Sequence, residues 1–222
     1  MGISRVRRLA RAAAFAVALT VPVVALAILI RAEAGGVVEL DRAAVAAATD
    51  LARDRPVLRG ALLAWEEATQ ARWLNLGVAA VALWAWRRRG LGTRSAWAVI
   101  TLLVTWGLAN AVKYVVQRAR PVIDEALGHS PGYSFPSGHS MNAVGAGLVV
   151  TILLWPLLER RGRIVLVTAA AAVVALTGLD RVFVGAHFPS DVLAGFTLGT
   201  ALVGASWLGY RGWHPPTDKE PQ

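Results

Sequence analysis

Long uncharged runs alternate with short charged segments along most of this 222-residue chain. Because an apolar run of about 20 residues crosses the hydrocarbon core of a bilayer, the pattern predicts membrane-spanning helices. Six spans are expected, namely Ala12–Ile30, Trp73–Trp86, Ser95–Val112, Ser140–Leu158, Ile164–Leu179 and Val192–Tyr210. The predicted fold class is therefore all-α, a polytopic six-span bundle that forms one domain over residues 1–222.

Two of these spans have alternative interpretations. The run after the N-terminal arginines resembles a signal peptide, but its apolar core exceeds the usual h-region, no convincing A-x-A site closes it and more apolar segments follow. We therefore predict an uncleaved first span. The run Trp73–Trp86 has only 14 residues and by length alone suits a re-entrant or interfacial piece. Its flanking tryptophans and the arrest at "RRRG" favour a span.

The polar segments between the spans are expected to lie outside the bilayer. Residues 31–72 mix acidic and basic side chains with apolar spacing, which predicts an external loop with short interfacial helices. The tail 212–222 is predicted to be disordered. His129 in a loop and His214 in the tail lack partners in the sequence, and both are interpreted as solvated surface residues.

Composition narrows the chemistry. Hydrophobic residues make up 56% of the chain, above the roughly 45–50% of a soluble domain. Cysteine is absent, which excludes disulfides, thiolate metal sites and cysteine nucleophiles. The carboxylates outside the predicted spans are not clustered with histidines at metal-ligand spacing. We therefore expect neither a metal nor another cofactor.

The net charge of +9 is explained by topology. Basic residues concentrate on alternate connections, which the positive-inside rule assigns to the cytoplasm. The basic side comprises Arg5, Arg7, Arg8, Arg11, Arg87, Arg88, Arg89, Arg94, Arg160, Arg161, Arg163, Arg211 and Lys219. The sequence thus predicts a multi-pass cell-membrane protein with cytoplasmic termini, and a nucleic-acid partner is not needed to explain the charge.

Unusual polar residues gather at the span ends on the opposite, extracytoplasmic side. In "KYVVQRARP", Lys113 and Arg120 would lie about two turns apart on one face of a continuing helix, although Pro121 permits a bend. In "PSGH", Ser137 and Gly138 would open a helix with exposed backbone N–H groups, which favours anion binding. His139 beside them is a candidate proton donor.

The stretch "DRVFVGAHFPSD" completes this set. His187 and Asp191 are four residues apart, so the carboxylate can orient one ring nitrogen and leave the other free to react. Pro189 fits only the first turn of a helix, which predicts that the last span begins there. Arg181 adds a third cation to Lys113 and Arg120, and three cations match the oxygens of a phosphoryl group.

In these three motifs the chain resembles the type 2 phosphatidic acid phosphatase family, membrane relatives of vanadium haloperoxidases with the motifs K-x6-R-P, P-S-G-H and S-R-x5-H-x3-D. The similarity spans residues 113–191, and Asp180 stands where the family usually has serine. The resemblance implies a catalytic set of His187 as nucleophile, Asp191 as its orienting partner and His139 as acid. It implies a phosphate-binding set of Lys113, Arg120, Ser137, Gly138 and Arg181.

The expected function is hydrolysis of a lipid phosphate monoester or diphosphate through a phosphohistidine at the outer membrane face. Candidate substrates are a polyprenyl diphosphate, phosphatidylglycerol phosphate and phosphatidic acid. The sequence leaves two alternatives open. One is phosphoryl or headgroup transfer by the same residues, and the other is a lipid-phosphate binding or transport protein. Transport fits less well, because the charges lie at span ends rather than at the midplane.

Overall fold

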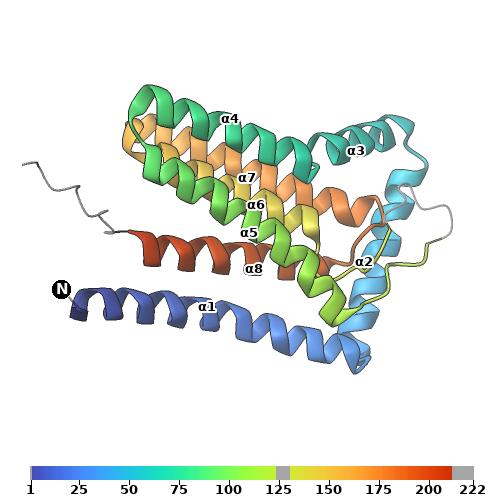
Figure 1. Ribbon diagram of the computed structural model, residues 1–222. Helices are drawn as coiled ribbons and strands as arrows, with labels where there is room; N and C mark the ends of the chain where they lie inside the picture. The colour runs from blue at the N-terminus through green and yellow to red at the C-terminus, as the bar shows by residue number, and fades with distance from the viewer. Residues whose placement is uncertain (1, 124–130, 212–222) are drawn as a thin grey trace, which may run out of the picture.

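The computed structural model describes residues 2–123 and 131–211, and its regular elements are all helices (Figure 1). The expected all-α class is confirmed. The elements are α1 (Gly2–Arg31), α2 (Gly35–Arg53), α3 (Pro56–Ala68), α4 (Ala71–Arg89), α5 (Gly92–Val116), α6 (Gly138–Leu154), the 3₁₀ turn η1 (Trp155–Leu157), α7 (Arg160–Phe183) and α8 (Pro189–Tyr210). His129, His214 and the tail 212–222 lie outside the described residues.

Five helices in the described ranges are long and apolar enough to cross a membrane: α1, α5, α6 with η1, α7 and α8. The sixth expected span corresponds to α4, which is not among these five. Its 19 residues nevertheless run alongside α5 and α6 in the bundle (Figure 1). At 1.5 Å per residue, a helix of this length measures roughly 28 Å. The expected count of six spans is therefore approximate.

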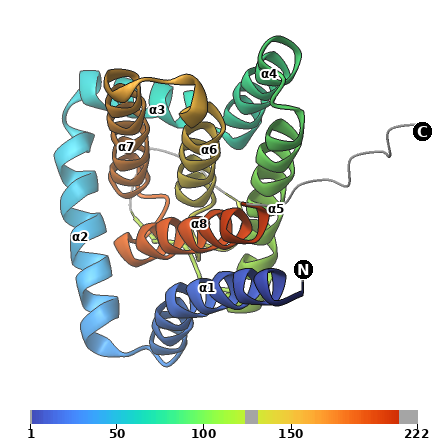
Figure 2. The same cartoon turned by 90° about the vertical axis from the view of Figure 1, so that its left-hand side faces the viewer.

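Helix α6 is the central element, and it packs against α4, α5, α7 and α8 (Figure 2). Two glycines of α8 allow close contact with it. A Cβ at Gly195 would lie 2.7 Å from the Ser137 carbonyl oxygen, and one at Gly199 would lie 2.8 Å from that of Met141. Since Cβ atoms do not approach backbone that closely, glycine at both positions brings the start of α8 against the start of α6.

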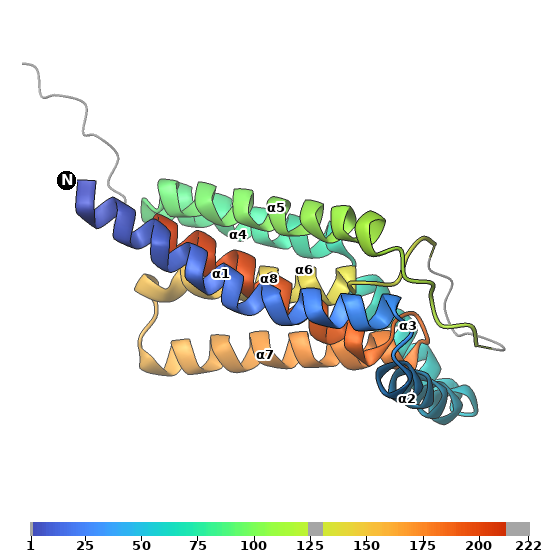
Figure 3. The same ribbon diagram turned by 90° about the horizontal axis from the view of Figure 1, so that it is seen from below.

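The segment 31–72, expected as a loop with short helices, forms α2 and α3 at one end of the bundle (Figure 3). Both helices contact α7, and α2 also contacts α8. Trp65 of α3 donates a hydrogen bond from Nε1 to Thr177 Oγ1 of α7 at 3.2 Å. These two helices therefore border the ends of α7 and α8, where the candidate site lies.

Helix α5 ends before it reaches Pro121, the position at which the sequence permits a bend. It ends at Val116, and the next residue, Gln117, has a left-handed backbone with φ 53°. Lys113 is therefore on the last turn of α5, whereas Arg120 lies on the irregular segment that follows. The expectation that both share one face of a continuing helix is wrong, although the break in the helix brings both near the same site.

Candidate active site

The connection between α7 and α8 holds His187. Gly185 has φ +78°, a conformation that favours glycine, and the backbone N–H groups of Ala186 and His187 both donate to the Arg181 carbonyl at 3.1 Å. Helix α8 begins at Pro189, as predicted, with Asp191 in its first turn. This tight turn points His187 into the protein, where only 2% of the residue is exposed.

Asp191 lies beside His187, as the four-residue spacing predicted. Its Oδ2 is 3.6 Å from His187 Nδ1, and the same oxygen accepts a hydrogen bond from the Phe188 backbone N–H at 2.9 Å. Ser134 donates to this oxygen as well, and its Oγ lies 3.4 Å from His187 Nδ1. The carboxylate is fully buried, so it is held in one orientation toward the ring.

Arg120 defines which nitrogen of His187 is free to react. Its Nη1 lies 3.3 Å from His187 Nε2, and a guanidinium can only donate. Nε2 therefore carries the lone pair and Nδ1 the proton. Three backbone carbonyls fix the guanidinium, those of Ala186 at 2.7 Å, Gly132 at 3.0 Å and Pro131 at 3.1 Å.

The surroundings keep His187 uncharged at neutral pH. Burial lowers the pKa of His187 to about 4, although its contacts with Asp191 oppose this shift and raise the pKa. The charges of Arg120 and Lys113 lower the same pKa further. A neutral imidazole with an unprotonated Nε2 is the form that can attack an electrophile.

The start of α6 adds backbone donors, a histidine and a lysine. Ser137 caps the helix, since its Oγ accepts from the Ser140 N–H at 3.4 Å, and Gly138 is the first helical residue, as predicted. A Cβ at Gly138 would lie 3.8 Å from Lys113 Nζ, so the ammonium faces this helix start. His139 Nε2 is buried and has no hydrogen-bond partner among the described residues.

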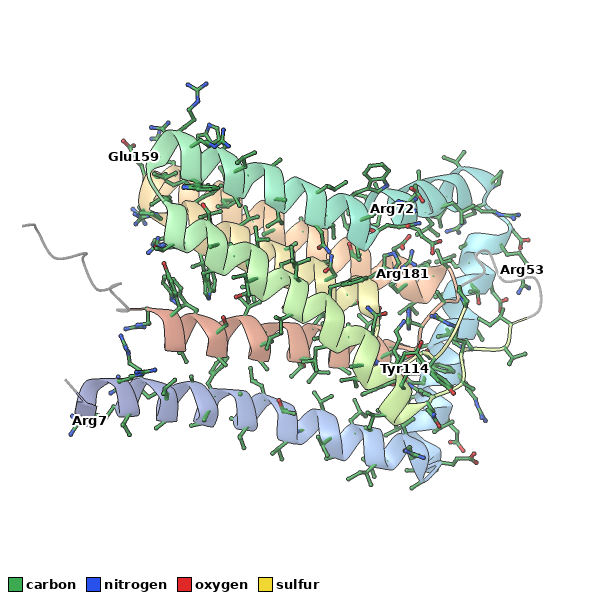
Figure 4. The ribbon with its side chains drawn as sticks, in the orientation of Figure 1. Arg7, Arg53, Arg72, Tyr114, Glu159 and Arg181 are labelled. Carbon is green, nitrogen blue, oxygen red and sulfur yellow. The ribbon has the colours of Figure 1, made fainter. Side chains whose placement is uncertain are left out.

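Arg181 extends from the last turn of α7 into the interior and is fully buried (Figure 4). Its Nε donates to Asp180 Oδ2 at 2.9 Å, and its Nη2 is paired with the same oxygen. Its Nη1 donates to Glu66 of α3 at 2.7 Å. The aspartate that replaces the family's usual serine therefore binds the candidate phosphate-binding arginine.

Four residues of the site were not selected from the sequence. Arg118 lies inside "KYVVQRARP" but occupies no motif position, and Ser134 stands two residues before "PSGH". Asp41 of α2 and Glu66 of α3 come from the stretch predicted as an external loop, and no spacing signals either one. All four form hydrogen bonds or ion pairs with motif residues or their immediate neighbours.

A cavity of about 740 Å³ lies beside this cluster. Arg118, Arg120 and Phe188 line it, with the end of α1 and one face of α2 opposite them. Within residues 2–123 and 131–211, no group of three or more His, Cys, Asp and Glu side chains has an arrangement that could hold a metal ion.

The fold and the site together define a multi-pass helical membrane protein with a histidine-centred, cation-rich site at one end of its bundle. Comparison with known proteins assigns the family. The PAP2 superfamily model matches residues 94–215, which is more than half of the chain, and this chain belongs to that superfamily. The resemblance inferred from the three motifs is confirmed.

A solved structure matches most of the chain. It is the crystal structure of a transmembrane PAP2 type phosphatidylglycerolphosphate phosphatase from Bacillus subtilis, with a TM-score of 0.77 and 27% identity. The match covers 86% of this chain and 93% of that one. It supports the expected membrane bundle beyond the motif region.

Sequence relatives are similar over a shorter stretch. Phosphatidylglycerophosphatase B of Bacillus subtilis is 37% identical over 116 residues, which are 49% of this chain and 56% of the relative. A lipid A 1-phosphatase of Rhizobium johnstonii is 39% identical over 47% of this chain and 43% of its own length. An undecaprenyl-diphosphatase of Sulfolobus acidocaldarius is 32% identical over half of each chain. The chain thus spans about half the length of these curated relatives.

Proposed function

We propose that this protein is a membrane lipid phosphatase that hydrolyses a phosphate monoester or diphosphate through a phosphohistidine on His187. The observation that carries the proposal is the buried, neutral His187, whose unprotonated Nε2 lies 3.3 Å from Arg120 Nη1. Lys113, Arg181 and the N-terminus of α6 supply further positive charge and donors. The similar proteins named as lipid phosphatases and diphosphatases support the same class of reaction.

In the proposed first step, His187 Nε2 attacks phosphorus and the bond from phosphorus to the leaving oxygen breaks. His139 donates a proton to that oxygen, and the cations stabilise the charge on the phosphoryl oxygens. In the second step, water attacks the phosphohistidine while His139 accepts its proton. Inorganic phosphate is released and His187 Nε2 regains its lone pair, with Asp191 stabilising the charged ring throughout.

A lipid substrate and an extracytoplasmic site belong to the same proposal. The arginine-rich helix ends lie at the opposite end of the bundle from Arg181, as Arg7 and Arg181 illustrate in Figure 4. The positive-inside rule then assigns the site to the outer face. The cavity beside Arg120 opens where a lipid headgroup would lie and offers an entry at the end of the spans.

Phosphate release from lipid vesicles tests the proposal. The purified protein is assayed with phosphatidylglycerol phosphate, phosphatidic acid and a polyprenyl diphosphate, in EDTA, with and without vanadate, beside His187→Ala. We expect release that persists in EDTA, is inhibited by vanadate and is lost in the variant. Full activity of a folded His187→Ala protein would overturn the proposal. Formation of a phosphorylated acceptor instead of free phosphate would establish a transferase.

A further inference from the structure

Arg118 connects the catalytic carboxylate to helix α2. Its Nη1 donates to Asp191 Oδ1 at 2.6 Å, and its Nη2 donates to Asp41 Oδ2 at 2.7 Å. The side chains of all three residues are no more than 7% exposed. Arg118 occupies an unspecified position of the K-x6-R-P motif, so neither the motif nor the spacing gives it a role.

The same arginine fixes the second oxygen of Asp191 through its backbone. The Arg118 carbonyl accepts a hydrogen bond from the Ser134 N–H at 2.9 Å, and Ser134 Oγ donates to Asp191 Oδ2. One residue therefore sets both edges of the carboxylate, Oδ1 directly and Oδ2 through Ser134. Its guanidinium carbon also lies 4.0 Å from the centre of the Phe188 ring, which limits its movement.

Asp41 anchors this arrangement from outside the motif region. It accepts from the Ser190 backbone N–H at 3.0 Å and from the Ser190 hydroxyl, so it also holds the first turn of α8. Two buried carboxylates share one guanidinium, and one negative charge remains beside His187. That charge favours the positively charged ring that forms on phosphorylation.

The geometry points to Arg118 as a positioning residue for His187, acting through Asp191 and held in place by Asp41 of α2. This role in turnover rests on the proposed function. Although Arg118 lines the cavity proposed as the headgroup entry, both arms of its guanidinium are paired with buried carboxylates. Its substitution should therefore alter the rate of the chemical step and leave KM nearly unchanged. If Arg118 only stabilised the fold, its substitution would lower the amount of folded protein without lowering kcat separately from KM.

The first test compares the effect of substitutions on kcat with their effect on KM in the vesicle phosphate-release assay. We expect Arg118→Gln to lower kcat about 10- to 100-fold, which is the usual effect of removing a residue that hydrogen-bonds to an active-site group and orients it. KM should stay within about 3-fold of the wild-type value. Arg118→Lys keeps the positive charge but cannot contact both carboxylates as the guanidinium does, so its kcat should lie between those of the wild type and Arg118→Gln. Asp41→Asn should lower kcat less than Arg118→Gln does.

Arg59→Gln is the matched control, because Arg59 is exposed on α3 at the same end of the molecule. It removes the same charge and should leave kcat and KM unchanged. Unaltered kcat in folded Arg118→Gln would overturn the inference. Equal loss in Arg118→Lys and Arg118→Gln, accompanied by an equal loss of folded protein, would also overturn it and reduce the network to a stabilising one.

A second measurement does not depend on activity, so it separates this inference from the proposed function. The His187 ring is titrated by carbon-13 NMR between pH 3 and 7 in folded wild type, where the pKa is about 4. The charged or titratable groups facing this ring are Asp191, Lys113, Arg120 and His139. Arg118→Gln should raise the midpoint, because the Arg118 guanidinium no longer offsets the negative charge of Asp191. Arg59→Gln should leave the midpoint unchanged. An unchanged midpoint in folded Arg118→Gln would contradict the positioning role, whether or not the wild type releases phosphate.

Discussion

At the scale of single residues, the site is defined by which polar atoms have partners. Asp191, Arg120 and Arg181 are all held by hydrogen bonds or ion pairs. His139 Nε2 is buried without a partner among the described residues. A buried nitrogen in that condition costs free energy, on the order of 1–3 kcal/mol, which a bound substrate oxygen would recover.

The proposed acid role of His139 predicts a dependence on the leaving group. We expect His139→Gln to reduce phosphate release from a lipid alkyl phosphate by about 10²- to 10⁴-fold. The loss should be much smaller with p-nitrophenyl phosphate, because p-nitrophenolate leaves without a proton. The ratio of kcat/KM for the two substrates measures the effect. Equal losses on both would show that His139 does not act as the acid.

The pairing of Arg181 with Glu66 predicts that this carboxylate competes with phosphate. Glu66→Gln removes a negative charge from the Nη1 arm, so vanadate should inhibit about 5-fold more tightly, a change on the order of 1 kcal/mol. Glu67→Gln is the matched control, because Glu67 is exposed and pairs with Arg72. Inhibition constants measure both. Unchanged or weaker inhibition in Glu66→Gln would contradict the competition.

At the scale of helices, the site depends on the ends of α5, α6, α7 and α8 meeting at one place. The start of α6 receives the start of α8, where the Ser137 N–H donates to the Asp191 carbonyl at 3.0 Å. The helix starts at Gly138 and Pro189 were predicted from the sequence, because Ser-Gly and proline have strong positional preferences at a helix N-terminus. The contact between the two helices was not, because no local pattern encodes it.

The close approach of α8 to α6 predicts a large effect from one methyl group. Gly195→Ala would place a Cβ 2.7 Å from the Ser137 carbonyl oxygen, so the helices must separate, at a cost of about 1–3 kcal/mol. Thermal unfolding in detergent should show a lower Tm, with reduced phosphate release. Gly107→Ala on α5 is the control, since nothing lies within 4 Å of its added Cβ. A Tm equal to that of the control would refute the packing argument.

Across the whole molecule, the membrane bundle and the motif residues were predicted from the sequence, but the residues that hold the motif side chains in place were not. Long apolar runs and motif spacing are local signals, and His187, Asp191 and Arg120 lie together as those signals indicated. Asp41 and Glu66 reach the site only because α2 and α3 fold back over the helix ends. A contact between residues 149 positions apart, such as Asp41 with Ser190, has no counterpart in local sequence pattern.

The orientation in the membrane is a prediction about the whole chain. Because the chain has no cysteine, single cysteines introduce unique labelling sites. In intact cells, a membrane-impermeant maleimide should label Asp54→Cys, next to α2 at the site end. It should label Arg161→Cys, at the opposite end, only after permeabilisation. Both positions are exposed. The reverse pattern would place the site on the cytoplasmic side.

We propose that His187 carries the phosphoryl group during turnover, and rapid trapping of the intermediate can detect that species. Protein mixed with the lipid phosphate that reacts fastest, labelled with phosphorus-32, is quenched in alkali within one turnover and digested. We expect an alkali-stable, acid-labile label on the peptide containing His187, and no such label in His187→Ala. A wild-type protein that releases phosphate without forming this label, or that carries the label at another residue, would rule out His187 as the nucleophile.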